Sequence, residues 1–306
     1  MKIAIYGLGR MGAQIARKLH EGGHAVIASN RSAGPIDEMK SLGMVGAYTK
    51  EEVISSFQND QVIVWIMVPS DVVDSELDTW LSIIPKGSIL IDGGNSKWSD
   101  TKRRAEKVKE SGSKLIDVGT SGGVWGYQNG FSMMVGGDND AVEIIKPVLE
   151  TLKNPEGMYA YFGESGSGHF VKMVHNAIEY GMMESLAEGY RLLKEGPYKN
   201  LDLYKAGDVW QHHSVITSWL NELTRDALKN NPEQKDIEGT VAESGEARWA
   251  LEVAKDFNIE MKSIQASFDV RLDSQKGKVN FATKLLASMR NAFGGHRINN
   301  ESGSRK

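Results

Sequence analysis

Residues 2–19 contain the pattern that most restricts the fold. "KIAIYGLGRMGAQIARKL" places Gly7, Gly9 and Gly12 in G-x-G-x-x-G spacing, directly after an apolar run and at the start of a helical pattern. In such a βαβ unit the first glycine permits the tight turn, the second lets the backbone approach a pyrophosphate, and the third lets the helix pack closely. The N–H groups and the dipole at the start of the helix then hold the phosphates. The pattern predicts a dinucleotide-binding turn, with a purely structural glycine turn as the alternative. The expected cofactor contacts are Gly7, Leu8, Gly9, Arg10, Met11 and Gly12.

The end of the second apolar run indicates which dinucleotide is bound. It reads "ASNRS", so Asn30, Arg31 and Ser32 stand where NAD enzymes usually carry a carboxylate for the ribose 2′-hydroxyl. An arginine beside a hydroxyl suits a 2′-phosphate, which it can bind by charge-assisted hydrogen bonds. The sequence therefore favours NADP over NAD, and the alternative is an ordinary exposed loop arginine. Val68, which ends the fourth apolar run, is a further expected cofactor contact.

Two parts of the chain differ in their hydrophobic pattern. Up to residue 163, helical stretches such as 10–21 and 98–111 separate short apolar runs, several of them apolar throughout, as in strands buried on both faces of a sheet. The runs are "KIAIYG", "HAVIASN", "MVGAY", "QVIVWIMV", "SILIDGG", "KLIDVGT", "FSMMVGG" and "YAYFG". The expected fold is a largely parallel α/β Rossmann-type domain over residues 1–163, followed by an all-α domain over 164–298 and a flexible tail over 299–306.

Composition narrows the function classes. The net charge is −4, so no overall positive field favours nucleic acid or an anionic membrane, and neither is an expected partner. The chain has no cysteine, which excludes disulfides and thiolate catalysis. No basic-then-apolar leader precedes "KIAIYG", and the apolar run near 62–69 is too short for a bilayer. Together these features lead us to expect a soluble cytoplasmic protein. The seven histidines lack metal-ligand spacing, so we expect no metal.

A polar stripe interrupts the long helical pattern after residue 163. In "GSGHFVKMVHNAIEYGMM", Lys172, His175, Asn176 and Glu179 fall within about 100° of one helix face. The simple alternative is a solvated face, but the stripe continues as the apolar Met183. The stripe also follows a glycine-rich turn, where the helix dipole and partial burial favour an uncharged amine that can act as a base. The pattern predicts catalysis on this helix face.

These motifs together resemble the 6-phosphogluconate dehydrogenases, in their short-chain form. The resemblance covers nearly the whole chain and rests on "GLGRMG", "IDGGNS", "VGTSGGVWG", "GSGHFVKMVHNAIEYGMM" and "RNAFGGH", in the right order. It implies oxidative decarboxylation of 6-phosphogluconate, a small anionic sugar phosphate. Compared with the longer members, the helical domain here is abbreviated.

The resemblance also implies a role for individual residues. Lys172 matches the general base that takes the proton of the C3 hydroxyl, and Glu179 matches the acid that protonates C1 of the enediol. Asn95 matches a group that contacts both nicotinamide and substrate. The remaining matches are substrate contacts: Ser121, Gly122 and Gly123 for the carboxylate, and His175, Asn176 and Tyr180 on the helix.

Basic residues late in the chain match further substrate contacts. They are Arg271, Arg290 and His296, and the last two keep the six-residue separation seen in the longer enzymes. In the longer enzymes the residues matched by Arg290 and His296 reach across from a neighbouring subunit, so the resemblance implies a homodimer or homotetramer. Ser244 stands where a phosphate-binding lysine is expected, which leaves the full set of phosphate ligands open.

Two alternatives remain open on the sequence alone. Another β-hydroxyacid dehydrogenase, acting on a small 3-hydroxy acid, would use the same lysine but would not need Glu179 or the late arginine and histidine. A non-catalytic dinucleotide-sensing module would keep the glycine turn and have no reason to keep Lys172 and Glu179 two turns apart.

Overall fold

The computed structural model describes residues 1–295, and its secondary structure follows the predicted order. The strands are β1 (Lys2–Tyr6), β2 (Ala25–Ser29), β3 (Val45–Ala47), β4 (Ile63–Ile66), β5 (Ile89–Asp92), β6 (Lys114–Ser121), β7 (Ser132–Gly137) and β8 (Tyr159–Tyr161). The helices between them are α1 (Arg10–Glu21), α2 (Ala33–Ser41), α3 (Lys50–Phe57), α4 (Val73–Leu81), α5 (Trp98–Glu110), the 3₁₀ turn η1 (Gly123–Trp125), α6 (Gly126–Asn129) and α7 (Asn139–Lys153).

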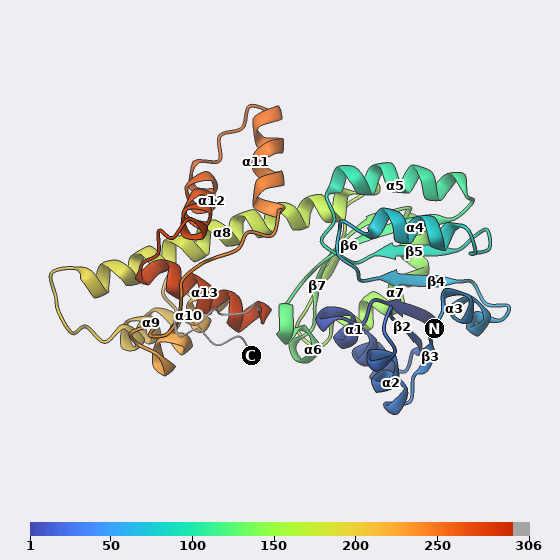
Figure 1. Cartoon of the computed structure of the whole chain (residues 1–306), viewed down its shortest axis with the longest axis horizontal. Helices are drawn as coiled ribbons and strands as arrows, with labels where there is room; N and C mark the ends of the chain where they lie inside the picture. Colours follow the sequence, from blue (N-terminus) through green and yellow to red (C-terminus); the bar gives the residue numbers. More distant parts are fainter. Residues whose placement is uncertain (296–306) are drawn as a thin grey trace. The chain divides into compact units, whose positions relative to one another are not determined.

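The strands form one sheet in the order β3-β2-β1-β4-β5-β6-β7-β8. All neighbouring pairs are parallel except β6 with β7, which are antiparallel. Helices cover both faces of the sheet, with α4 and α5 on one side and α1, α2 and α7 on the other (Figure 1). The order reverses between β1 and β4, and in such sheets ligands bind at the carboxyl ends of the strands near this point.

The apolar strands are explained by burial on both faces. Along β1, Ile3 and Ile5 pack under α1 and α7, whereas Ala4 and Tyr6 pack under α4. Because successive side chains point to opposite faces, a strand covered on both sides must be apolar throughout. The predicted α/β Rossmann-type fold is confirmed.

The second part of the chain is helical. It contains α8 (Ser167–Glu195), α9 (Leu203–Gln211), α10 (Trp219–Asn230), α11 (Glu246–Asp256), α12 (Lys262–Gln275) and α13 (Phe281–Gly294). Apolar side chains of α8, α9, α10 and α13 form one core, and Tyr180, Ala247 and Phe268 form a smaller one. Asn280 and Thr283 cap α13 reciprocally, which satisfies backbone donors at its first turn. The predicted all-α part is confirmed.

By backbone contacts, the chain divides into two compact units. Unit 1 runs from Met1 to Met173 and unit 2 begins at Val174, so α8 starts in unit 1 and continues into unit 2. The domain boundary near 163 and the flexible tail stay predictions, and residues 299–306 lie outside the described part. Within residues 1–295 no helix combines the length and apolar character that crossing a bilayer requires.

Candidate active site

The glycine turn between β1 and α1 has the geometry of a phosphate-binding turn. Gly7 has φ +99°, and a Cβ there would lie 2.3 Å from the carbonyl oxygen of Met67. A Cβ on Gly12 would lie 1.9 Å from the carbonyl oxygen of Gly7, so α1 packs directly on the turn. Gly9 is the N-cap of α1, and a Cβ there would meet nothing within 4 Å. The backbone at the start of α1 is thus open to a ligand, which fits a dinucleotide pyrophosphate.

The end of β2 is tied to this turn by a side chain. Asn30 accepts a hydrogen bond from the backbone N–H of Leu8 at 3.0 Å and donates to the hydroxyl of Ser32 at 2.9 Å. Arg31 and Ser32 are exposed beside it. Asn30 therefore supports the cofactor turn from within, while the arginine and the serine present their side chains outward.

The other predicted cofactor residues differ in exposure. Leu8 is buried, Arg10 is exposed at the first position of α1, and Met11 is half-buried. Val68 follows β4 and lies against the glycine turn, with its Cγ1 3.3 Å from the position that a Cβ on Gly7 would take.

Asn95 lies in a turn after β5 that is held from inside. Asp92, fully buried at the end of β5, accepts from the N–H of Gly94 at 3.2 Å and from the hydroxyl of Ser96 at 2.7 Å. Asn95, between these two residues, is exposed. The turn thus presents the Asn95 amide outward at the carboxyl end of a parallel strand.

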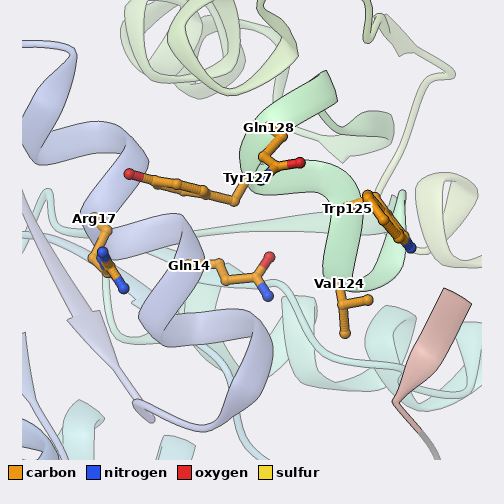
Figure 2. Close-up of a pocket in the computed structure, with 6 residues that line it drawn as sticks. All are labelled: Gln14, Arg17, Val124, Trp125, Tyr127 and Gln128. Atoms are coloured by element: carbon orange, nitrogen blue, oxygen red, sulfur yellow. The ribbon is translucent and has the colours of Figure 1, made fainter. Parts of the chain in front are cut away.

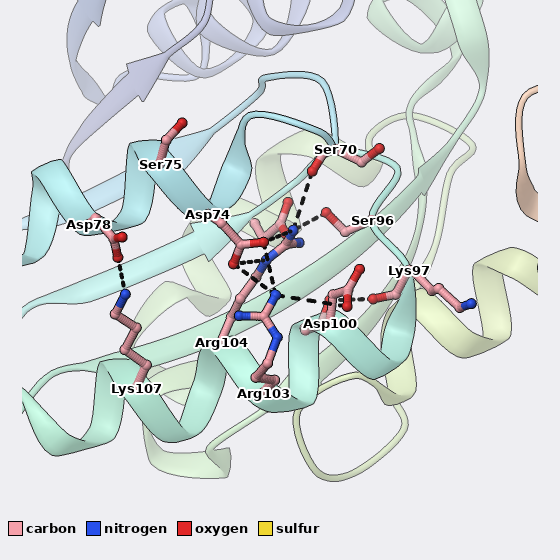
Figure 3. Close-up of polar contacts among 12 residues, drawn as sticks. Ser70, Asp74, Ser75, Asp78, Ser96, Lys97, Asp100, Arg103, Arg104 and Lys107 are labelled. Carbon is pink, nitrogen blue, oxygen red and sulfur yellow. Dashed lines mark hydrogen bonds and ion pairs between the residues drawn. The ribbon is translucent and has the colours of Figure 1, made fainter.

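Arg104 connects this turn to neighbouring elements (Figure 3). Its guanidinium lies 3.6 Å from Asp92, donates to Asp74 of α4 at 3.1 and 3.2 Å, and donates to the carbonyl of Ser70 at 3.3 Å. Arg103 binds the same Asp74 carboxylate, and these hydrogen bonds hold the pKa of Asp74 well below its usual range.

The segment after Ser121 is fastened to α1. Ser121 ends β6, and Gly122 and Gly123 follow with φ of +123° and +51°. Further on, Tyr127 accepts at its carbonyl from Lys18 and donates its hydroxyl to Glu21. The predicted carboxylate-binding residues therefore lie on a segment fixed to the dinucleotide helix.

A cavity of about 350 Å³ opens between α1 and this segment. Figure 2 shows Gln14 of α1 facing Val124 and Trp125, with Arg17 below the ring of Tyr127. The Arg17 guanidinium lies 5.3 Å from the centre of that ring. Sequence reasoning did not single out these α1 residues, although Gln14, Arg17, Lys18 and Glu21 share one helix face at spacings of three and four.

Lys172 lies on the second turn of α8 and is only 7% exposed. Its stem crosses β6 at Gly119, where an added Cβ would be 2.3 Å from the Cβ of Lys172. Asp117, also fully buried, accepts from the N–H groups of Gly166 and His169 at 2.7 and 2.8 Å. A carboxylate at the N-terminus of a helix accepts hydrogen bonds from the free backbone N–H groups there and is stabilised by the helix dipole. The solvated-face interpretation therefore does not fit Lys172.

The other residues of the stripe belong to unit 2. His175, Asn176 and Glu179 are half-buried. His175 Nδ1 lies 2.9 Å from Asn176 Oδ1, and Asn176 Nδ2 donates to Glu246 at 2.8 Å. Further along α8, Met183 is buried whereas Met182 is exposed, so the continuation of the stripe is only partly covered within this chain.

Two buried guanidinium groups lie near this part of α8. Arg271 lies 3.2 Å from the ring centre of Tyr180, whose hydroxyl accepts from the N–H of Ser244 at 3.1 Å. Burial lowers the pKa of Arg271 to about 10 and lowers that of Arg290, whereas Glu179 acts on both in the opposite direction. Glu184 also acts electrostatically on Arg271, and Glu246 on Arg290. His296 lies outside the described residues.

The structure therefore brings the predicted residues together in two sets. In unit 1 the glycine turn adjoins Asn30 and Val68, and Lys172 adjoins β6. In unit 2 His175 adjoins Asn176, and Tyr180 adjoins Arg271. Within residues 1–295 no group of three or more metal-binding side chains is assembled.

Several supporting residues were missed by sequence reasoning. They are Asp92, Asp117 and Gly119 at β5 and β6, Arg104 on α5, and Glu246 on α11. The two aspartates carried a signal, because each is a carboxylate within an apolar strand run, "ILID" and "LIDVG". A charged group there must be hydrogen-bonded inside the protein.

Comparison with known proteins gives a consistent result. Residues 2–163 match the NAD binding domain of 6-phosphogluconate dehydrogenase, and residues 168–303 match the C-terminal domain of 6-phosphogluconate dehydrogenase. The chain is 38% identical to the Bacillus subtilis protein YqeC, over 97% of this chain and 98% of that protein. It is 34% identical to the NAD(+)-dependent, decarboxylating 6-phosphogluconate dehydrogenase of Haloferax volcanii, over 97% and 98% of the two chains.

Longer relatives match over part of their length. The NADP(+)-dependent, decarboxylating enzyme of Bacillus subtilis is 32% identical, over 89% of this chain and 61% of its own. Among solved structures, the 6-phosphogluconate dehydrogenase of Plasmodium falciparum superposes with a TM-score of 0.82 and 27% identity, over 91% of this chain and 63% of that chain. A 3-hydroxyisobutyrate dehydrogenase of Mycobacterium tuberculosis, at 19% identity and a TM-score of 0.73, shares the fold over 94% of this chain and 99% of that chain.

The family inferred from the motifs is thus confirmed by two domain models that together span nearly the whole chain. The chain belongs to the 6-phosphogluconate dehydrogenase family of NAD(P)-dependent oxidoreductases.

Proposed function

We propose that this enzyme oxidises and decarboxylates 6-phosphogluconate to ribulose 5-phosphate and CO₂, with NADP as the preferred oxidant. The observation that carries the proposal is Lys172, buried against Gly119 on a helix that also bears His175 and Glu179. The decarboxylating enzymes among the relatives, from Haloferax volcanii and Bacillus subtilis, support the same reaction.

The residues of α8 fit the proton transfers of this reaction. Bound NADP would accept a hydride from C3 of the substrate. Lys172 takes the proton of the C3 hydroxyl, and the C1–C2 bond of the resulting 3-keto acid then breaks to release CO₂. Protonated Lys172 stabilises the enolate oxygen, and Glu179 delivers a proton to C1 of the enediol. Seven residues of helix separate the two groups by about 10 Å, a span that two long side chains can bridge around one sugar.

The two buried arginines of unit 2 suit the substrate phosphate. Arg271 and Arg290 bring positive charge into an environment that lowers the pKa of both. Two guanidinium groups in a buried environment can bind a phosphate dianion through strong charge-assisted hydrogen bonds. We propose these residues as phosphate contacts, with His296 as a third.

The proposed reaction is tested by a substrate screen. Purified enzyme is mixed with 6-phosphogluconate or small 3-hydroxy acids, and absorbance of the reduced nicotinamide and release of CO₂ are followed together. We expect both products only from 6-phosphogluconate. Turnover of a small 3-hydroxy acid without CO₂ release would support the rival β-hydroxyacid dehydrogenase instead.

The role of Lys172 is tested in the same assay. Lys172→Met should lower kcat about 10²- to 10⁴-fold, because the general base is lost, while the dissociation constant for NADP stays unchanged. Lys205→Met, at an exposed position of α9, removes the same charge and should leave kcat unaltered. Full turnover by the Lys172 variant would contradict the assignment.

The cofactor preference is a separate proposal that rests on Arg31 and Ser32. Arg31→Ala should raise the KM for NADP about 10- to 100-fold, as expected for one lost charge-assisted hydrogen-bond partner, and leave the KM for NAD unchanged. Arg191→Ala on α8 is the control. Equal effects on both cofactors would show that Arg31 does not read the 2′-phosphate.

The assembly and the location are also proposals. Residues late in the chain correspond to substrate contacts that cross a subunit boundary in the longer enzymes, so we propose a homodimer or homotetramer as the active unit. Analytical ultracentrifugation of the purified protein tests it, and a monomer with full activity would contradict it. The cytoplasmic location stays a prediction.

A further inference from the structure

Glu246 is a buried carboxylate that neither the motifs nor the proposed reaction uses. It is the first residue of α11 and is 2% exposed. Oε1 accepts from Asn176 Nδ2 at 2.8 Å, and Oε2 is buried without a hydrogen-bond partner among residues 1–295. Its charge also acts on the buried Arg290. A buried carboxylate with so few donors needs an explanation beyond packing.

The hydrogen bond from Asn176 fixes the orientation of that amide. An ionised carboxylate only accepts hydrogen bonds, so the NH₂ group of Asn176 must face Glu246 and its carbonyl oxygen must face the other way. The opposite orientation would place two acceptor oxygens against each other. Glu246 thus determines which atom Asn176 presents to its neighbour on α8.

That neighbour is His175, whose Nδ1 lies 2.9 Å from Asn176 Oδ1. Because Oδ1 is only an acceptor, Nδ1 must carry the proton. In the neutral ring Nε2 is then the acceptor. A sugar acid offers several hydroxyl donors, so this tautomer suits a contact with such a substrate.

We infer that Glu246 is a positioning residue that acts through Asn176 to hold neutral His175 as the Nδ1–H tautomer, with Nε2 as an acceptor for a substrate hydroxyl. The assignment of the hydroxyl rests on the proposed function, whereas the tautomer does not. Glu246 also places a negative charge near Arg290, and this second effect can be separated by the choice of variant.

The variants separate hydrogen bonding from charge. Glu246→Gln removes the charge but keeps a side-chain oxygen that can accept from Asn176. Glu246→Leu removes both. Glu252→Gln, on an exposed position of the same helix, removes one negative charge and is the matched control.

The first measurement is nitrogen NMR of the full-length enzyme labelled in its histidine rings, recorded well above the ordinary histidine pKa of about 6.5. The His175 signals are assigned by their loss in His175→Gln. We expect the Nδ1–H tautomer in the wild type, Glu246→Gln and Glu252→Gln, and a shift toward Nε2–H in Glu246→Leu. An Nε2–H tautomer in the wild type overturns the inference even if Glu246→Leu does not fold, and an unchanged tautomer in a folded Glu246→Leu does the same.

The second measurement is kcat/KM for 6-phosphogluconate. We expect a loss of about 10- to 100-fold in Glu246→Leu, the range found when the hydrogen-bond partner that orients a metal-binding histidine is removed, and substantial recovery in Glu246→Gln. Equal losses in both variants would assign the effect to charge and overturn the positioning role. If no variant and no wild-type enzyme turns over 6-phosphogluconate, the proposed function fails while the NMR result still decides the tautomer.

Discussion

Gly119 lies at the point of β6 where the stem of Lys172 crosses the strand. A methyl group there would approach Cβ and Cγ of Lys172 to 2.3 and 2.9 Å, distances that force one of the two elements to move. The absence of a side chain at one position therefore sets the height of the proposed base above the sheet.

Gly119→Ala should lower kcat about 10- to 100-fold, because an error of about 1 Å in the position of a catalytic group is costly. The dissociation constant for the cofactor should stay unchanged, since the glycine turn is intact. Gly189→Ala, at an exposed position of α8 where an added Cβ meets nothing within 4 Å, is the control and should keep wild-type kcat. Undiminished turnover by Gly119→Ala would show that Lys172 is not held by this contact.

The carboxyl group of Glu184 makes the free energy of unfolding depend on pH. Burial, and then the charge of Glu188, raise the pKa of Glu184 from 4.5 to about 7, while Arg271 opposes the shift. Between these two pKa values the folded chain binds the proton more tightly than the unfolded chain. Protonation of Glu184 therefore stabilises the folded chain at low pH, and this stabilisation is lost as pH rises from about 5 to 8.

Glu184→Gln removes that titration. The unfolding free energy of the wild type relative to the variant should therefore fall as pH rises, by about 3 kcal/mol at most. Denaturant unfolding of both proteins at pH 5 and pH 8 measures it, and the comparison cancels the other titrating groups. A difference that is constant with pH would mean that Glu184 titrates normally.

At the scale of elements, Arg104 of α5 connects the end of β5, the segment after β4 and the start of α4 (Figure 3). Two predicted cofactor contacts lie in these segments: Asn95 follows β5, and Val68 follows β4. Asp92 and Arg104 are almost fully buried, so removing one of them should destabilise the protein more than removing one partner of an exposed ion pair.

Arg104→Met should destabilise the protein by about 3–5 kcal/mol, because it leaves the buried Asp92 without its cation. Arg103→Ala, which removes an exposed cation from the same Asp74, should cost about 0–1 kcal/mol. Thermal or urea unfolding of the two variants compares them directly. Similar costs for both would show that burial does not distinguish the two arginines.

At the scale of the whole molecule, the local patterns predicted most of the fold. Strand periodicity, the glycine spacing and the long helical run depend on residues close in sequence, and each was found where predicted. The supporting residues of the site could not be predicted in this way. Asp117 contacts the start of α8 across 52 residues, and Glu246 contacts Asn176 across 70, so their roles exist only after folding.

The candidate site shows the same limit. The motif predicted that Lys172 and Glu179 share a face of one helix, because helical spacing is local. It could not predict that Arg271 lies on Tyr180 or that Asn30 supports the glycine turn through Leu8. These contacts depend on which elements meet, and a single sequence does not record that.

The fit of the Lys172 stem against β6 has a practical consequence. Shortening this buried side chain to alanine would remove the stem and the amine together, beside a strand position that has no side chain to fill the space. A small primary amine added to Lys172→Ala should then enter and restore part of the lost turnover, with an optimum at the amine whose length matches the missing stem.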